Sequence, residues 1–100
     1  MPMERPTSRE AYIELVNQAM GNAEELRRAI EADEEYVGIA KKLENNIKSL
    51  YASLIGGSYE HADEDLDFMD IVDTETDVRL SFKPLLRLIN QTHRQGLETG

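Results

Sequence analysis

The chain has 100 residues, 40% of them hydrophobic and 31% charged, so it can bury one modest core and is too apolar to be wholly disordered. It has no cysteine, which excludes disulfides, thiolate metal ligands and a cysteine nucleophile. Its net charge of −9 disfavours direct binding to nucleic acid, and it has neither a membrane-length apolar stretch nor the apolar run of a signal peptide, so we expect a cytoplasmic protein.

The N-terminal part of the chain predicts a short tail and a long helix. Residues 1–6 are expected to be a flexible tail, and residues 7–100 a single domain. Thr7 and Glu10 have the T-x-x-E spacing of a capping box, which begins a helix over about residues 8–31. Apolar residues then recur in alternating steps of four and three, which defines a heptad seam. The seam consists of Tyr12, Val16, Ala19, Ala23, Leu26 and Ile30.

A second seam of the same spacing predicts a helix over about residues 34–55, which Gly56 and Gly57 end. Its members are Tyr36, Ala40, Leu43, Ile47, Leu50 and Leu54. If the chain reverses between the helices, an alanine faces a larger side chain in three of the six seam pairs, as in close-packed layers. The rival is one continuous helix, on which the apolar face would drift by over a third of a turn. We therefore predict a long antiparallel αα-hairpin.

The charge imbalance lies in one stretch, residues 58–77, which we call the acidic segment. It holds nine Asp and Glu residues and no Lys or Arg, whereas the rest of the chain has eleven acidic and eleven basic residues. One interpretation is a solvated loop that keeps the protein soluble. The other is a docking surface for a basic partner.

The second half of the acidic segment predicts a short β-hairpin. Aromatic and β-branched residues in 68–73, and the alternation of Val78, Leu80 and Phe82 with polar residues, indicate strands over about 68–73 and 78–82. Ala62, Leu66 and Met69 also fit a helical face, so residues 58–72 stay open between helix, strand and loop. The predicted fold class is α+β, mainly α, with an all-α bundle as the alternative.

The C-terminal residues predict a helix over about 82–95. Ser81 is the expected N-cap, Pro84 is tolerated in the first turn, and Gly96 ends the helix. The helix is basic, and together with Arg79 it supplies four cations that we expect to pair with the acidic segment. The other three are Lys83, Arg87 and Arg94.

No motif for catalysis or for metal binding is complete. His61 and Asp65 have helical metal-pair spacing, but two ligands do not make a site. The run from Asp63 resembles a calcium loop but has Phe68 and Thr74 where the loop needs glycine and glutamate. His93 lies on an apolar helical face and is interpreted as a histidine at the edge of the core. We therefore expect no enzyme and no cofactor.

These observations favour a small, acidic, non-catalytic and regulatory module that binds and masks or positions another protein with a basic surface. An anti-activator of a transcription factor would suit this description. The predicted partner-binding residues are Tyr59, Glu60, Asp63, Glu64, Asp65, Asp67, Phe68, Asp70 and Ile71. The alternatives are a structural subunit whose helical hairpin is the interface and, third, a small enzyme or metal protein.

A homodimer is also expected, because several apolar residues lie off the two seams and the short C-terminal elements can hardly cover them all. These residues are Ile13, Leu15, Met20, Val37, Ile39 and Tyr51.

Overall fold

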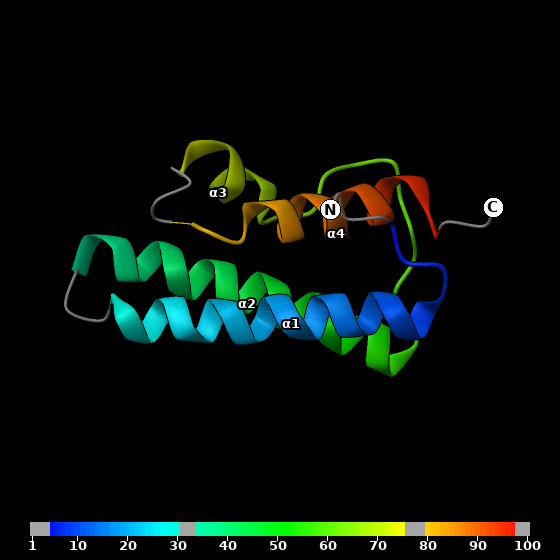
Figure 1. Cartoon of the computed structure of the whole chain (residues 1–100), viewed down its shortest axis with the longest axis horizontal. Helices are drawn as coiled ribbons and strands as arrows, with labels where there is room; N and C mark the ends of the chain where they lie inside the picture. Colours follow the sequence, from blue (N-terminus) through cyan, green and yellow to red (C-terminus); the bar gives the residue numbers. More distant parts are fainter. Residues whose placement is uncertain (1–4, 31–33, 76–79, 98–100) are drawn as a thin grey trace.

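A computed structural model describes residues 5–30, 34–75 and 80–97 of the chain. The described residues form four helices: α1 (Arg9–Ala29), α2 (Glu34–Gly56), α3 (Met69–Thr74) and α4 (Lys83–Gln95). Helices α1 and α2 lie side by side, α4 packs along α1, and the short α3 packs against α4 (Figure 1).

Helix α1 begins one residue later than the capping box predicts. The N-cap is Ser8, not Thr7, and the Ser8 hydroxyl accepts a hydrogen bond from the Ala11 backbone amide at 3.1 Å. Serine and threonine both cap helices by this geometry, with serine the more favourable, so the capping-box spacing alone did not identify the N-cap. At the other end Arg27 and Arg28 lie in the last turn, where cations favour the helix dipole.

The two heptad seams form the interior of the hairpin. Ten of the twelve seam residues are buried, and Leu26 and Ile30 near the turn are half-buried. The guanidinium of Arg9, at the start of α1, donates to the Leu54 carbonyl near the end of α2. The helices therefore run antiparallel, which confirms the predicted hairpin and excludes one continuous helix.

Two ion pairs join the hairpin on its polar side. Arg27 Nε lies 3.0 Å from a Glu44 carboxylate oxygen, and Lys48 Nζ lies 3.8 Å from the Glu24 carboxylate. Within α2, Lys48 Nζ also lies 3.5 Å from Glu44. Burial alone would raise the pKa of Glu44, but the Arg27 hydrogen bond and the charges of Lys48 and Arg27 outweigh it and leave that pKa below its ordinary value of 4.5. The ion pair between Arg27 and Glu44 therefore stabilises the hairpin above about pH 4.5, and this contribution falls as the Glu44 carboxylate is protonated.

Helix α2 ends where the glycine pair predicts. Gly57 has a φ of 81°, which side chains disfavour, and the amides of Ser58 and Tyr59 both donate to the Ser53 carbonyl at 3.1 Å. This turn directs the following acidic segment back over α2.

The predicted β-hairpin is wrong. No strand is present among the described residues: 69–74 form α3, and Leu80 to Phe82 lead into α4 without pairing, while residues 78 and 79 lie outside the described part. A lone two-stranded ribbon is marginal in water. A single helical turn, by contrast, buries Phe68, Ile71 and Val72 together, because these positions share one helical face. The fold is the all-α alternative.

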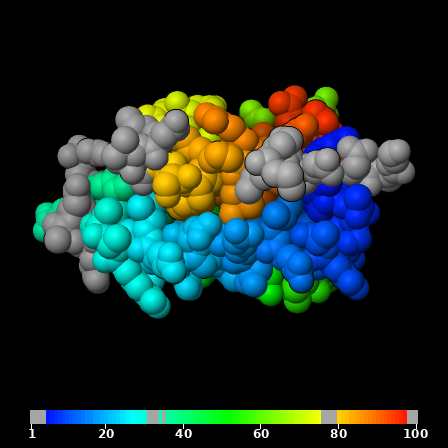
Figure 2. All heavy atoms as spheres, in the orientation of Figure 1, coloured from blue at the N-terminus to red at the C-terminus, as the bar shows by residue number. Residues whose placement is uncertain are grey.

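Helix α4 supplies the second layer. Its N-cap is Phe82 rather than the expected Ser81, with Pro84 in the first turn, and it ends at Gly96, whose φ is 84°. Figure 2 shows α4 lying against α1 along one face of the molecule. No helix in the described ranges is long and apolar enough to cross a membrane.

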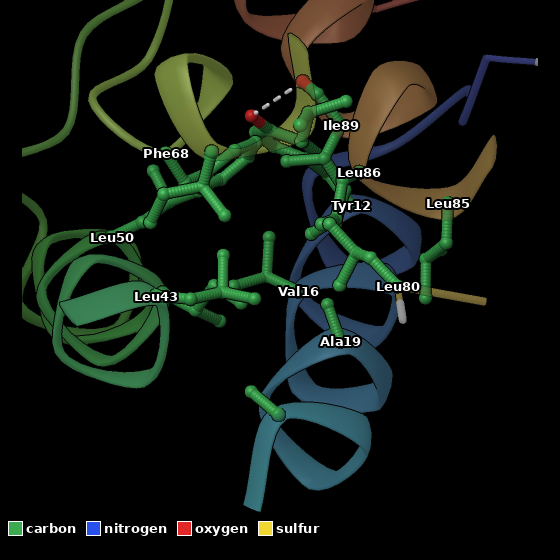
Figure 3. Packing of buried hydrophobic residues seen from close by; sticks show 14 of the residues in the cluster. Tyr12, Val16, Ala19, Leu43, Leu50, Phe68, Leu80, Leu85, Leu86 and Ile89 are labelled. Carbon is green, nitrogen blue, oxygen red and sulfur yellow. Dashed lines mark hydrogen bonds between the residues drawn. The ribbon is translucent and has the colours of Figure 1, made fainter. Parts of the chain in front are cut away.

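The core lies where the three longer helices and the α3 region meet. Buried side chains from all of them converge there, among them Val16, Leu43, Phe68, Leu86 and Ile89 (Figure 3). The same view shows the Tyr12 hydroxyl reaching from α1 to the Ile89 backbone carbonyl on α4.

Candidate functional site

The acidic segment is held against α4 by polar contacts. The Asn90 side chain accepts from the Leu66 amide at 2.8 Å and donates to the Asp65 carboxylate at 2.9 Å. Arg94 lies 3.1 Å from Asp63 and 3.2 Å from Asp65. The cations of α4 were expected to pair with the acidic segment within the chain or across a dimer, and Arg94 forms such pairs within the chain.

The other predicted cations behave differently. The Lys83 amine donates to the Glu75 backbone carbonyl. Arg87 is exposed, and no ion pair joins it to another described residue. Arg79 lies outside the described residues. Among the described residues, Glu60, Glu64 and Asp67 of the segment form no ion pair.

The described part of the acidic segment and the C-terminal half of α2 enclose a groove of about 450 Å³. We call this the acidic groove. Four of its lining residues are acidic and one is a histidine, and Lys and Arg are absent from the lining. The groove is lined by Asn46, Ser49, Leu50, Ser53, Ser58, Tyr59, Glu60, Glu64, Asp65, Leu66, Asp67, Phe68 and His93.

The predicted partner-binding residues divide into three groups. Tyr59, Glu60, Glu64, Asp65 and Asp67 come together in the groove with exposed carboxylates and a half-buried phenol. Three other members lie outside it: exposed Asp63 and Asp70, and Ile71, which is in the core. Phe68 lines the groove but is only 1% exposed, so its ring belongs chiefly to the core.

A cluster of two tyrosines and two histidines closes one end of the acidic segment. Tyr59 Oη lies 3.2 Å from Tyr12 Oη, 2.6 Å from His93 Nδ1 and 3.3 Å from His61 Nδ1. The His61 ring is stacked on Tyr12 at a centroid separation of 6.0 Å and meets Tyr59 edge-on at 5.0 Å. One phenol therefore ties together α1, α4 and the segment.

Burial sets the protonation of this cluster. Burial is the largest cause that raises the pKa of Tyr12 and that of Tyr59, so both phenols are neutral at physiological pH. Burial is also the largest cause that lowers the pKa of His93; the charge of His61 adds to it and that of Glu64 opposes it. His93 is therefore neutral at pH 7.

The cluster and the groove contain residues that the sequence did not indicate as functional. Asn46 of the groove and Tyr12 of the cluster were not singled out for a site, nor was Asn90, which holds the segment against α4, and His93 was interpreted as a core-edge histidine. His93 is buried as expected, but it also lines the groove. One sequence pattern could have indicated these contacts: Asn90, His93 and Arg94 share one face of α4.

The described residues contain no group of three or more His, Asp or Glu side chains placed to hold a metal ion. His61 and Asp65 serve other contacts: His61 stacks on Tyr12, and Asp65 accepts hydrogen bonds from Asn90 and Arg94.

Comparison of the chain with models of protein families, with curated protein sequences and with solved structures gave no match. Its function is therefore argued from the acidic groove and the residues around it.

Proposed function

We propose that this chain is a non-catalytic regulatory module that binds a basic segment of a partner protein in the acidic groove. The observation that carries the proposal is the charge of the groove lining. Glu60, Glu64 and Asp67 are exposed there and have no ion pair within the described chain. Mutually repelling carboxylates around one hollow are offset when a cationic partner enters.

The groove also offers apolar surface beside its charges. Leu50, Leu66, Tyr59 and Phe68 contribute to its lining. A bound segment could thus place the stems of basic side chains on apolar atoms and their charged ends at the carboxylates. This combination supports a peptide-like occupant more than a freely hydrated cation.

A catalytic role has less support. A general base must be within hydrogen-bond reach of the group it activates. His93 has one contact of this kind, to Tyr59, and no nucleophile of the described chain lies within hydrogen-bonding distance of its other ring nitrogen.

The alternative, a structural subunit that assembles through the hairpin, is favoured less because the hairpin covers its own apolar face. The off-seam residues expected to drive dimerisation are all half-buried, and all but Val37 pack against the core. Among the described residues, Ile55 is the large hydrophobic residue that stays exposed, at 59%. The homodimer and the cytoplasmic location stay predictions, as does the finer proposal that the partner is a transcription factor masked by binding.

The proposal is tested by removing the unpaired charges of the groove. A variant with Glu60→Gln, Glu64→Gln and Asp67→Asn should keep the fold, since these side chains are exposed. Its association with a partner isolated from the source cell should slow by at least about tenfold at low salt.

The matched control carries Glu14→Gln, Glu25→Gln and Glu34→Gln, three exposed carboxylates on the hairpin helices. This variant loses the same net charge but should retain most of the association rate. Equal rates for the parent and the groove variant, measured by biolayer interferometry across a salt series, would refute the proposal.

A further inference from the structure

His93 lines the acidic groove with one ring nitrogen that has no hydrogen-bond partner among the described residues. The His93 side chain is only 7% exposed, and Nε2 makes no hydrogen bond to another described residue, whereas Nδ1 contacts Tyr59. Within the described chain the buried side-chain nitrogen or oxygen that lacks a partner is Asn46 Nδ2. His93 Nε2 is therefore not sealed from solvent, and the hollow that His93 lines is the acidic groove.

The hydrogen bonds around Tyr59 determine where His93 carries its proton. The single hydroxyl proton of Tyr12 is donated to the Ile89 carbonyl, 3.2 Å away. In the arrangement that gives each of these contacts its own proton, Tyr59 donates to Tyr12. The Tyr59 proton is thus engaged, so the 2.6 Å contact with His93 requires a proton on His93 Nδ1. A neutral His93 with its proton on Nδ1 presents a lone pair on Nε2 to the groove.

This lone pair adds a directional acceptor to the carboxylates of the groove. The acceptors come from different elements: His93 from α4, and Glu60, Glu64 and Asp67 from the acidic segment. Helix α2 contributes uncharged residues to the opposite wall. A planar guanidinium has five donors in a fixed fork and stacks on aromatic rings, whereas an ammonium is a compact, strongly hydrated charge. Dispersed acceptors beside the Tyr59 ring suit the guanidinium better.

We infer that the acidic groove binds an arginine side chain of the partner's basic segment, with His93 Nε2 as the buried acceptor and the groove carboxylates as counter-ions. This inference rests on the proposed function and specifies the ligand of the same site. It makes His93 a positioning and specificity residue rather than a catalyst.

Binding of this kind depends on pH through His93. Protonation of Nε2 converts the acceptor into a charged donor that repels the guanidinium, so affinity should be highest where His93 is neutral. The groups that face the ring are Tyr12 from α1, and Tyr59, His61 and Glu64 from the acidic segment. The phenols stay neutral between pH 5 and 8. Below the pKa of His93, affinity should fall by about tenfold per pH unit.

The test uses the full chain and two labelled peptides with blocked ends, one with four arginines spaced by glycine and serine, the other with lysines in their place. Fluorescence anisotropy from pH 5 to 8 at constant ionic strength gives the Kd of each. We expect the arginine peptide to bind at least about threefold more tightly at pH 7.5. We also expect its affinity to fall with decreasing pH.

Two variants test whether His93 causes the pH dependence of arginine-peptide binding. His93→Gln should bind the arginine peptide more weakly at pH 7.5 and with a flat profile between pH 7 and 5. His61→Gln should keep a pH-dependent affinity, with its midpoint moved to higher pH, because the charge of His61 no longer lowers the pKa of His93. ¹⁵N spectra of the unsubstituted protein should show His93 protonated at Nδ1 and unprotonated at Nε2, a result that needs no variant to fold.

Equal affinity for both peptides, a parental profile in folded His93→Gln, or a proton on Nε2 at pH 7.5 would each overturn the inference. None of these outcomes would affect the proposed function, which is decided by the salt-dependent loss of partner binding in the groove variant.

Discussion

The helical hairpin and the acidic segment are held in place by different kinds of interaction. In the hairpin, buried apolar side chains recur every three or four residues along both helices. In the first part of the segment, residues 58–67, the contacts are chiefly polar and involve Tyr59, Asp65 and the facing Asn90 on α4. The hairpin is therefore stabilised by many interchangeable contacts, whereas the loss of one polar contact should loosen residues 58–67 locally. A groove wall that is held by a few polar contacts can adapt to a partner while the hairpin stays fixed.

The largest effect is expected in the hairpin. Ile47 is fully buried in the seam of α2, and Ile47→Ala should lower the free energy of unfolding by about 2–5 kcal/mol, because it removes buried methylenes and leaves a cavity. Ile55→Ala is the control on the same helix, since Ile55 is 59% exposed, and should change stability by less than about 0.5 kcal/mol. Urea denaturation measures both; equal midpoints would mean that α2 does not present its seam to α1.

The same difference explains how much could be predicted from the sequence. Both long helices, their antiparallel pairing and the glycine that ends α2 were predicted, because each depends on spacing within a short stretch of chain. The contacts of the acidic segment join residues far apart, such as Asp65 with Asn90 and Tyr59 with His93. A local pattern carries no information about such pairs.

The β-hairpin was predicted wrongly for a related reason. In the six residues 68–73 an apolar pattern fits the strand period and the helical period about equally, and sequence periodicity decides only over longer windows. Packing decided between them, since one helical turn places Phe68, Ile71 and Val72 in the core together. The acidic wall of the groove was predicted, because a run of charges is visible without a fold. The α2 wall and His93 were not, because they join the groove only in three dimensions.

A moderate and local effect is expected from Asn90. Asn90→Ala leaves the Leu66 amide and the Asp65 carboxylate without this partner, which should cost about 1–3 kcal/mol. Hydrogen exchange should accelerate at the Leu66 amide and its neighbours in the segment, while the amides in the middle of α1 and α2 keep their protection. Gln91→Ala, an exposed neighbour on α4, is the control and should change neither. Uniform acceleration across the hairpin would show that the two regions unfold together.

The smallest change in stability, and the most specific one, is expected at Tyr12, whose ring lies in the hairpin seam and whose hydroxyl reaches the acidic segment. Tyr12→Phe keeps the ring and removes hydrogen bonds to the Ile89 carbonyl and to Tyr59, at a cost of about 0.5–1.5 kcal/mol. Tyr51→Phe, at a half-buried tyrosine of α2, is the matched control.

The Tyr12 hydroxyl also sets the direction of the Tyr59 hydrogen bond. Without it Tyr59 is free to donate to His93 Nδ1, so the proton of neutral His93 should move to Nε2, the nitrogen that has no hydrogen-bond partner among the described residues. The groove then loses its neutral acceptor although none of its lining residues has changed. ¹⁵N spectra should detect this change of tautomer, and the arginine peptide should bind Tyr12→Phe more weakly than Tyr51→Phe at pH 7.5. If His93 keeps its proton on Nδ1 in Tyr12→Phe, the hairpin does not control the groove through this hydroxyl, and the two regions are linked by packing alone.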